Sequence, residues 1–287
     1  LTDLARLVNL EFKYKIKKII FICSDINTLN LNKFLKINSI THYLNFAALK
    51  HVRSEENFNS CMYMYNTNCI YPFKIGNLSK LKKLKKIFFI STDKAVYPLS
   101  VMGLTKKIME HKLFNLKKKY PKKFISSVRF ANVSFSNGSL LKSVYEKTIN
   151  KSTFGVPTKI KRYFIKQKEA ANLCFKSLLK ISDGQIVLPS YESIGKPYDL
   201  VDLTKKIVKF LGKKPVFLTK LNNKKINGQK IILQKTNIMG QKNIEKLYEG
   251  DETIKNLNNN NLILKTSFRN LKKLNRNEIQ ILKSKNI

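Results

Sequence analysis

The chain has 287 residues, of which 43% are hydrophobic and 10% aromatic, so it can bury a sizeable core and is not a disordered protein. Its formal net charge of +38 would suggest a nucleic-acid-binding protein, but the excess is nearly all lysine, spread over the whole length. Arginine, the better residue for paired contacts to phosphate, occurs only at Arg6, Arg53, Arg129, Arg162, Arg269 and Arg276. We therefore predict no specific nucleic-acid partner.

Cysteine and histidine are scattered rather than paired. The cysteines form no Cys-x-x-Cys motif, which indicates free thiols in a reducing cytoplasm and no metal site; they are Cys23, Cys61, Cys69 and Cys174. No apolar run approaches the roughly 18 residues of a membrane-spanning helix. No signal peptide opens the chain, so we expect a cytoplasmic protein without a transmembrane segment.

The first third of the chain alternates helix-like and strand-like segments. Apolar spacing predicts helices over 1–10, about 28–37 and 57–81, the last one broken near Pro72. Between them, short apolar runs predict strands at 19–23 and 41–49, and a third strand follows at 87–90.

The alternation continues beyond residue 100. Helices are predicted at about 100–119, up to about 150, at 167–180 and at 199–212, and strands at 125–130, 162–165 and 185–189. From 250 onward, the Asn and Lys content predicts a frayed tail. Alternating strands and helices indicate an α/β fold with a Rossmann-like, doubly wound parallel sheet.

A polar motif follows the strand at 87–90. Ser91-Thr92-Asp93-Lys94 stands at the end of this apolar run, where α/β proteins place their sites. An adjacent carboxylate and ammonium can act as an acid and a base in one reaction. Taken alone, the pair is better explained as a solvated surface ion pair.

Five segments in order resemble the nucleotide-sugar 4,6-dehydratases of the extended short-chain dehydrogenase/reductase superfamily, of the polysaccharide-biosynthesis type that acts on UDP-N-acetylglucosamine or a relative. They are NFAALKHVRSEEN (45–57), ISTDKAVYP with VMGLTK (90–106), VRFANVSFSNGSLL (128–141), IKRYF (160–164) and GQKNIEKLYE (240–249). The resemblance implies a 4-keto-6-deoxy product for surface polysaccharide or nonulosonic-acid biosynthesis. It also implies a UDP- or GDP-linked amino sugar as substrate and a homo-oligomer.

The resemblance assigns catalytic roles. Asp93 would protonate the departing carbon 6 hydroxyl, Lys94 would take the carbon 5 proton, and Thr92 would hydrogen-bond the carbon 4 hydroxyl. Met102 stands where the superfamily places a tyrosine, four residues before Lys106 on one helix face. Since methionine cannot relay a proton, Thr92, Asp93 or water would receive the carbon 4 hydroxyl proton. Tyr97 is an alternative phenol in a constrained position before proline.

For the cofactor, NAD or NADP, the resemblance points to residues after two strands. They are Asp25, Ile26, Phe46, Ala47, Ala48, Lys50 and Lys106. The glycine-rich turn that cradles the pyrophosphate is missing, and Leu1 falls just after the second strand of the family pattern. We expect a truncated chain that binds the dinucleotide poorly and is itself inactive.

For the substrate, amides, hydroxyls and cations are the expected contacts. They are Lys50, His51, Asn132, Ser136, Asn137 and Arg162, whereas Arg129 is expected to be structural. Simpler interpretations are a surface salt bridge for Arg162 and an ordinary turn at Asn137. Tyr71-Pro72 and Gln241 depart from the family pattern, which fits a decayed gene product.

The expected organisation is a truncated NAD(P)-binding domain over 1–190 and a carboxyl-terminal substrate lobe and tail over 191–287, with about 133–165 contributing to the lobe. Two rivals stay open. One is a nucleotide-sugar 4-epimerase or reductase on the same fold, which would need tyrosine at position 102. The other is a catalytically silent cationic protein that only binds nucleotide sugars or nucleic acid.

Overall fold

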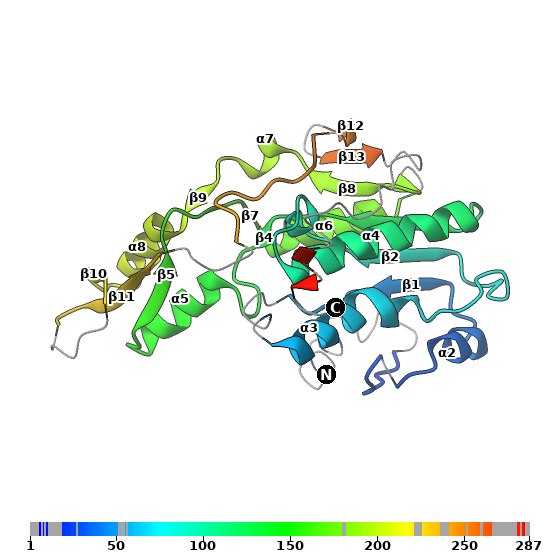
Figure 1. Cartoon of the computed structure of the whole chain (residues 1–287), viewed down its shortest axis with the longest axis horizontal. Helices are drawn as coiled ribbons and strands as arrows, with labels where there is room; N and C mark the ends of the chain where they lie inside the picture. The colour runs from blue at the N-terminus through cyan, green and yellow to red at the C-terminus, as the bar shows by residue number, and fades with distance from the viewer. Residues whose placement is uncertain are drawn as a thin grey trace.

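The computed structural model describes most of the chain (Figure 1). The described residues are 19–26, 28–50, 55, 57–179, 182–220, 226–235, 241–250, 252–258 and 261–265, with 6, 8, 10, 280, 281, 283 and 284. Within these ranges, no helix is both long and apolar enough to cross a lipid bilayer.

A six-stranded sheet forms the centre of the larger part, in the order β1-β2-β3-β8-β13-β12. Its first four strands run parallel; they are β1 (His42–Asn45), β2 (Lys86–Ile90), β3 (Phe124–Val128) and β8 (Ile186–Pro189). The predicted α/β fold with a Rossmann-like parallel sheet is confirmed.

Helices cover both faces of this sheet. Side chains alternate along a strand, so Ile87 and Phe89 pack into one core cluster with α2 (Leu31–Ile37) and α4 (Val101–Lys119). Phe88 belongs to a second cluster, which contains residues of α6 (Gln167–Ser177). β2 is therefore buried on both faces of the sheet, and this packing holds in place the strand and the helices that carry the candidate site.

The predicted long helix over 57–81 is wrong in its second half. α3 (Phe58–Tyr65) passes into the π-helix η2 (Asn66–Ile70) and the single 3₁₀ turn η3 (Tyr71–Phe73). Pro72 in η3 lacks the N–H that an α-helix needs at this point, so the helix ends there. The residues from 74 to 85 form turns.

A smaller sheet lies to one side of the molecule (Figure 1). It contains β10 (Pro215–Leu218), β11 (Gln229–Gln234) and β5 (Phe154–Pro157), all parallel. Val144 of α5 (Leu140–Ile149) and Val208 of α8 (Leu200–Phe210) share its core.

Two further sheets have only two short strands each, and we call them the short ladders. They are β4 (Asn132–Val133) with β7 (Phe164–Ile165), and β6 (Lys161–Arg162) with β9 (Tyr198–Asp199). The short helix α7 (Tyr191–Ile194) follows β8 directly. These ladders bring the chain after β3 back toward the carboxyl ends of the central strands.

Two sequence-based predictions are wrong. Residues 19–23 form no strand, and Ile20 and Ile22 are exposed, because an apolar run becomes a strand only where a neighbouring strand accepts its hydrogen bonds. Residues predicted as a frayed tail form β12 (Thr253–Asn258) and β13 (Asn261–Lys265), which pairs antiparallel with β8. The average composition of this region conceals the apolar run Leu262-Ile263-Leu264.

Candidate active site

The centre of the candidate site is the segment that follows β2. Thr92 caps the 3₁₀ turn η4 (Asp93–Ala95), and its hydroxyl accepts a hydrogen bond from the backbone N–H of Lys94. Asp93 is 1% exposed. Its Oδ1 accepts hydrogen bonds from Thr92 Oγ1 at 2.9 Å and from Lys94 Nζ at 3.0 Å. The structure thus brings the three predicted catalytic residues of this motif together.

The second oxygen of Asp93 is the unusual feature. Oδ2 is buried and has no hydrogen-bond partner among the described residues. Leaving a buried acceptor unsatisfied costs on the order of 1–3 kcal/mol, and more for a charged group. An acceptor of this kind is completed by a water molecule, an ion or a ligand donor. Thr67, Ser126, Gln185 and Gln241 also have a buried side-chain atom without a partner, so the position of Asp93 at the strand end is what singles it out.

Lys94 connects this carboxylate to further polar side chains. Lys94 Nζ also donates to Asn132 Oδ1 at 3.3 Å, and Lys50 Nζ donates to Ser136 Oγ at 3.5 Å. Burial, followed by the charge of Lys94, lowers the pKa of Lys50. Two ammonium groups close enough to influence each other favour an anionic ligand.

The other predicted substrate residues are Asn137, Arg162 and His51. The Asn137 side chain accepts a hydrogen bond from Lys142 of α5. His51 falls outside the described residues.

Arg162 is buried, and its Nη1 donates to the carbonyl oxygens of Lys161, Lys242 and Asn243. Burial lowers the pKa of Arg162, while Glu245 and Asp93 act in the opposite direction. Its contact with the substrate stays a prediction.

The start of α4 holds Met102 and Lys106. Ser100 caps the helix, and the carboxylate of Glu55 accepts the N–H groups of Val101 and Met102, both at 2.9 Å. A carboxylate at a helix amino terminus stabilises the first turn. The Met102 side chain is 3% exposed and packs with Cys61, Met64 and Val101.

Lys106 lies one turn further along α4 and is buried. Its Nζ donates to the carbonyl oxygen of Ile90 at 2.9 Å. Burial lowers the pKa of Lys106 to about 8, although Cys69 and Glu110 act in the opposite direction. The side chain therefore joins α4 to the strand end that carries the catalytic motif.

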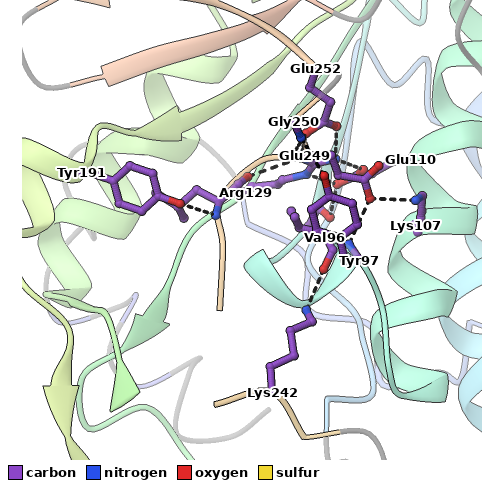
Figure 2. A network of polar contacts seen from close by, with 12 residues as sticks. Val96, Tyr97, Lys107, Glu110, Arg129, Tyr191, Lys242, Glu249, Gly250 and Glu252 are labelled. Atoms are coloured by element: carbon purple, nitrogen blue, oxygen red, sulfur yellow. Dashed lines mark hydrogen bonds and ion pairs between the residues drawn. The ribbon is translucent and has the colours of Figure 1, made fainter. Parts of the chain in front are cut away.

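A buried ion-pair network connects α4 to Arg129 and to the carboxyl-terminal segment with Glu252 (Figure 2). Arg129 donates to Glu110 at 2.8 and 2.6 Å and to Glu252 at 2.8 Å in two places. Burial acts to lower the pKa of Arg129, but the two carboxylates together raise it. Glu110 also accepts the Ser91 hydroxyl at 2.5 Å. This arrangement agrees with the structural role expected for Arg129.

Four of the residues predicted to bind the cofactor, Phe46, Ala47, Ala48 and Lys50, follow the carboxyl end of β1 in the chain. Phe46 is 56% exposed and its ring lies 5.7 Å from that of Phe88, and Ala47 and Ala48 are exposed. Asp25 Oδ2 accepts the Tyr63 hydroxyl at 3.5 Å, and Ile26 follows it in a turn. Their part in cofactor binding stays a prediction.

Sequence reasoning missed Tyr191, which lies close enough to Asp93 to be influenced by its charge. Tyr191 packs between Tyr163 and Tyr248, and its hydroxyl accepts the N–H of Leu247 at 3.1 Å. Burial raises the pKa of Tyr191, with the charge of Asp93 among the further causes.

Acidic residues of the same region were missed as well. Glu245, Glu249 and Glu252 each form an ion pair. The chain has only 18 acidic residues against 56 basic ones, so a cluster of acidic residues is unusual in it. That cluster could have pointed to this region. Within the described ranges, no group of three or more His, Cys, Asp or Glu side chains could hold a metal ion.

Solved structures with the same fold include the crystal structure of Pen from Bacillus thuringiensis. It matches with a TM-score of 0.70 and 20% identity, over 92% of this chain and 77% of that one. DesIV from Streptomyces venezuelae, a dTDP-glucose 4,6-dehydratase with NAD and TYD bound, matches with a TM-score of 0.60 and 16% identity, over 72% of this chain and 68% of that one. At these identities the likeness shows the fold.

Curated relatives extend the comparison to sequence. The capsular polysaccharide biosynthesis protein CapD of Staphylococcus aureus is 31% identical over 209 residues, which cover 71% of this chain and 34% of the relative. The probable polysaccharide biosynthesis protein EpsC of Bacillus subtilis is 32% identical over 150 residues, or 50% of this chain and 24% of the relative. The aligned part thus spans about a third or less of these relatives.

The polysaccharide biosynthesis protein family matches residues 3–266, which is most of the chain and includes every site residue described above. The chain therefore belongs to the polysaccharide biosynthesis protein family.

Proposed function

We propose that the protein is a nucleotide-sugar 4,6-dehydratase that converts UDP-N-acetylglucosamine, or a close relative, to its 4-keto-6-deoxy derivative. The observation that carries this proposal is the Asp93–Lys94 pair at the end of β2, with one carboxylate oxygen engaged and the other buried without a partner among the described residues. An elimination needs an acid and a base at adjacent carbons, and this pair supplies both within one short turn.

The described residues fit two ends of a nicotinamide dinucleotide. Small side chains at Ala47 and Ala48 follow β1, which runs beside β2, and would admit the nicotinamide. Lys106 would hold the ribose with the third N–H of its ammonium, because Ile90 and the sulfur of Met109 accept the other two. Asp25 would face the adenine. When bound, the nicotinamide supplies oxidation at carbon 4 of the sugar and reduction at carbon 6.

The elimination itself falls to the chain's own residues. Transfer of a proton from Lys94 Nζ to Asp93 Oδ1, across 3.0 Å, turns the ion pair into a neutral amine and a neutral acid. The amine takes the proton from carbon 5, which the neighbouring ketone acidifies. The acid gives its proton to the carbon 6 hydroxyl, which leaves as water, and a double bond forms between carbons 5 and 6. Thr92, bonded to the same carboxylate, orients the carbon 4 oxygen.

Met102 has no acid–base role in this scheme. Its side chain packs in an apolar cluster, so the carbon 4 hydroxyl proton passes to Thr92, Asp93 or water. A 4-epimerase on this fold would instead require a phenol near that position. The UDP-glucose 4-epimerase of Rickettsia bellii is 33% identical over 128 residues, so this reaction is the rival to test.

The test uses the full-length protein with UDP-N-acetylglucosamine and NAD or NADP in deuterated water. Loss of one water from the sugar, with deuterium incorporated at carbon 5, supports the dehydratase. Lys94→Ala abolishes this product, whereas Lys85→Ala, an exposed lysine at the opposite end of β2, does not. A 4-epimer formed without loss of water would overturn the proposal.

A further inference from the structure

Tyr97 has a left-handed backbone conformation three residues after Lys94. Its φ is 42°, a region that costs a residue with a side chain roughly 1–2 kcal/mol relative to the right-handed region. Such a conformation persists only where the surroundings enforce it, and it is common near functional sites. Contacts from a distant segment of the chain hold Tyr97 in this conformation.

The segment 241–250, which we call the strap, contacts Tyr97 at three points. Glu249 Oε1 accepts the backbone N–H of Tyr97 at 3.0 Å, and the N–H of Gly250 donates to the Tyr97 hydroxyl at 2.7 Å. Lys246 Nζ lies 5.8 Å from the centre of the Tyr97 ring. The backbone and the side chain of Tyr97 are therefore both held by the strap (Figure 2).

The residue before Tyr97 is held in the same way. Lys242 Nζ donates to the carbonyl oxygen of Val96 at 2.6 Å and to Glu245 Oε2 at 2.8 Å. Arg162 donates to the carbonyl oxygens of Lys242 and Asn243. The strap is thus fixed to the short ladder that carries Arg162 and, through Lys242, to the turn after the catalytic pair.

Glu249 is in turn anchored to the core. Its Oε1 accepts Lys107 Nζ of α4 at 2.8 Å, and both side chains are largely buried. The N–H of Glu249 donates at 2.7 Å to Glu252, which pairs with Arg129. A continuous series of hydrogen bonds and ion pairs therefore runs from Arg129 through Glu252 and Glu249 to the backbone of Tyr97 (Figure 2).

The backbone of α4 approaches this turn closely at Gly103. A Cβ added at Gly103 would collide with the carbonyl oxygen of Lys94 and would stand 3.3 Å from Pro98 Cβ. The segment from Lys94 to Pro98 thus lies between the bare backbone of α4 and the strap.

We propose that Glu249 and Tyr97 are positioning residues, which hold the Asp93–Lys94 turn in its working geometry by fixing the left-handed backbone at position 97. The catalytic part of this inference rests on the proposed dehydratase function. The mechanical part, which is that Glu249 restrains residues 93–98, stands independently of it. Each part has its own measurement.

Hydrogen–deuterium exchange of the full-length protein tests the mechanical part. In Glu249→Ala, exchange in the peptide that covers 93–98 is expected to rise about tenfold or more, because the Tyr97 amide loses its acceptor. Glu192→Ala, an exposed carboxylate of α7, serves as the control and leaves this peptide unchanged. Unchanged exchange in Glu249→Ala overturns the inference, whether or not the enzyme turns over.

Steady-state kinetics test the catalytic part. Glu249→Ala should lower kcat about 10- to 100-fold with little change in KM, since small misplacements of reacting groups are costly. The decisive comparison is between two double variants, Glu249→Ala with Tyr97→Gly and Glu249→Ala with Tyr97→Ala. Both lose the ring, but only glycine adopts a positive φ without strain.

Several-fold higher kcat for the glycine variant supports the inference, and equal kcat values overturn its catalytic part. If the wild-type protein forms no dehydrated product while exchange at 93–98 still responds to Glu249→Ala, the proposed function fails and the restraint by Glu249 stands.

Discussion

Lys94 Nζ lies 3.0 Å from Oδ1 of Asp93, while Oδ2 of the same carboxylate is buried and lacks a partner among the described residues. Because only one of the two oxygens is paired, we expect a change at Asp93 to affect activity far more than stability. Asp93→Asn keeps the side-chain shape and removes an incompletely solvated charge. We expect its unfolding temperature to stay close to that of the wild type.

The same variant should lose dehydration by about 10²- to 10⁴-fold, the usual contribution of a general acid. Thermal unfolding and product formation, measured on one preparation, check this pair of outcomes. Early unfolding of Asp93→Asn would assign the carboxylate a structural role instead.

Lys106 should make the stability depend on pH. The pKa of Lys106 falls from 10.5 in the unfolded chain to about 8 in the folded protein, so between these values the unfolded chain binds more protons. Lys106 therefore makes the free energy of unfolding increase as the pH rises from 8 to 10.5. Below pH 8 the buried charge costs about 3 kcal/mol.

Lys106→Met removes that cost. We expect the variant to be more stable than the wild type at pH 7, with the difference shrinking toward pH 10.5. Urea unfolding at about pH 7, 8.5 and 10 measures it. A difference that stays constant with pH would mean that burial of the ammonium is not its cause.

The Arg129–Glu110 pair should behave as a buried ion pair. Both side chains are 3% exposed, so Glu110→Gln leaves a buried guanidinium with one charged partner. We expect a loss of about 3–5 kcal/mol in the free energy of unfolding. Removing both charges, as in Glu110→Gln with Arg129→Met, should recover part of this loss.

A surface pair gives the comparison. Lys142 and Glu146 are 3.8 Å apart and 37% and 55% exposed, so Glu146→Gln should cost less than about 1 kcal/mol. Similar costs at the two sites would contradict the distinction.

Met102 should tolerate a change of shape better than the introduction of a phenol. Met102→Leu conserves volume and is expected to cost less than about 1.5 kcal/mol and to keep the dehydratase reaction. Met102→Tyr places a hydroxyl among Cys61, Met64 and Val101, where we expect a loss of about 1–3 kcal/mol. Chemical unfolding and product formation measure the two effects. Faster turnover in Met102→Tyr than in the wild type would show that a phenol is needed after all.

The sequence allowed the buried strand before Thr92-Asp93-Lys94 to be predicted, because such a strand is a local pattern. That this motif forms the site follows only from the family resemblance, and it stays a prediction. The parallel sheet and the helix of Met102 and Lys106 follow from equally local patterns. Residue composition was a poorer guide, since it concealed the strand at 261–265.

The strap could not be predicted in this way. Glu249 reaches Tyr97 across 152 positions of the sequence, and its function depends on a backbone angle that no side-chain pattern encodes. The contacts of Arg162 could not be predicted either. Its guanidinium donates to backbone carbonyl oxygens, and because every residue has one, no sequence pattern marks these partners.

The pairing of β13 with β8 determines how far the chain can be shortened. Ile186–Pro189 is buried along its whole length, and β13 occupies one of its two edges. A shortened protein that ends before residue 241 would present this apolar edge to solvent, and an uncovered hydrophobic edge strand recruits further chains. Such a protein would be expected to precipitate during expression, even though every residue of the catalytic turn is still present.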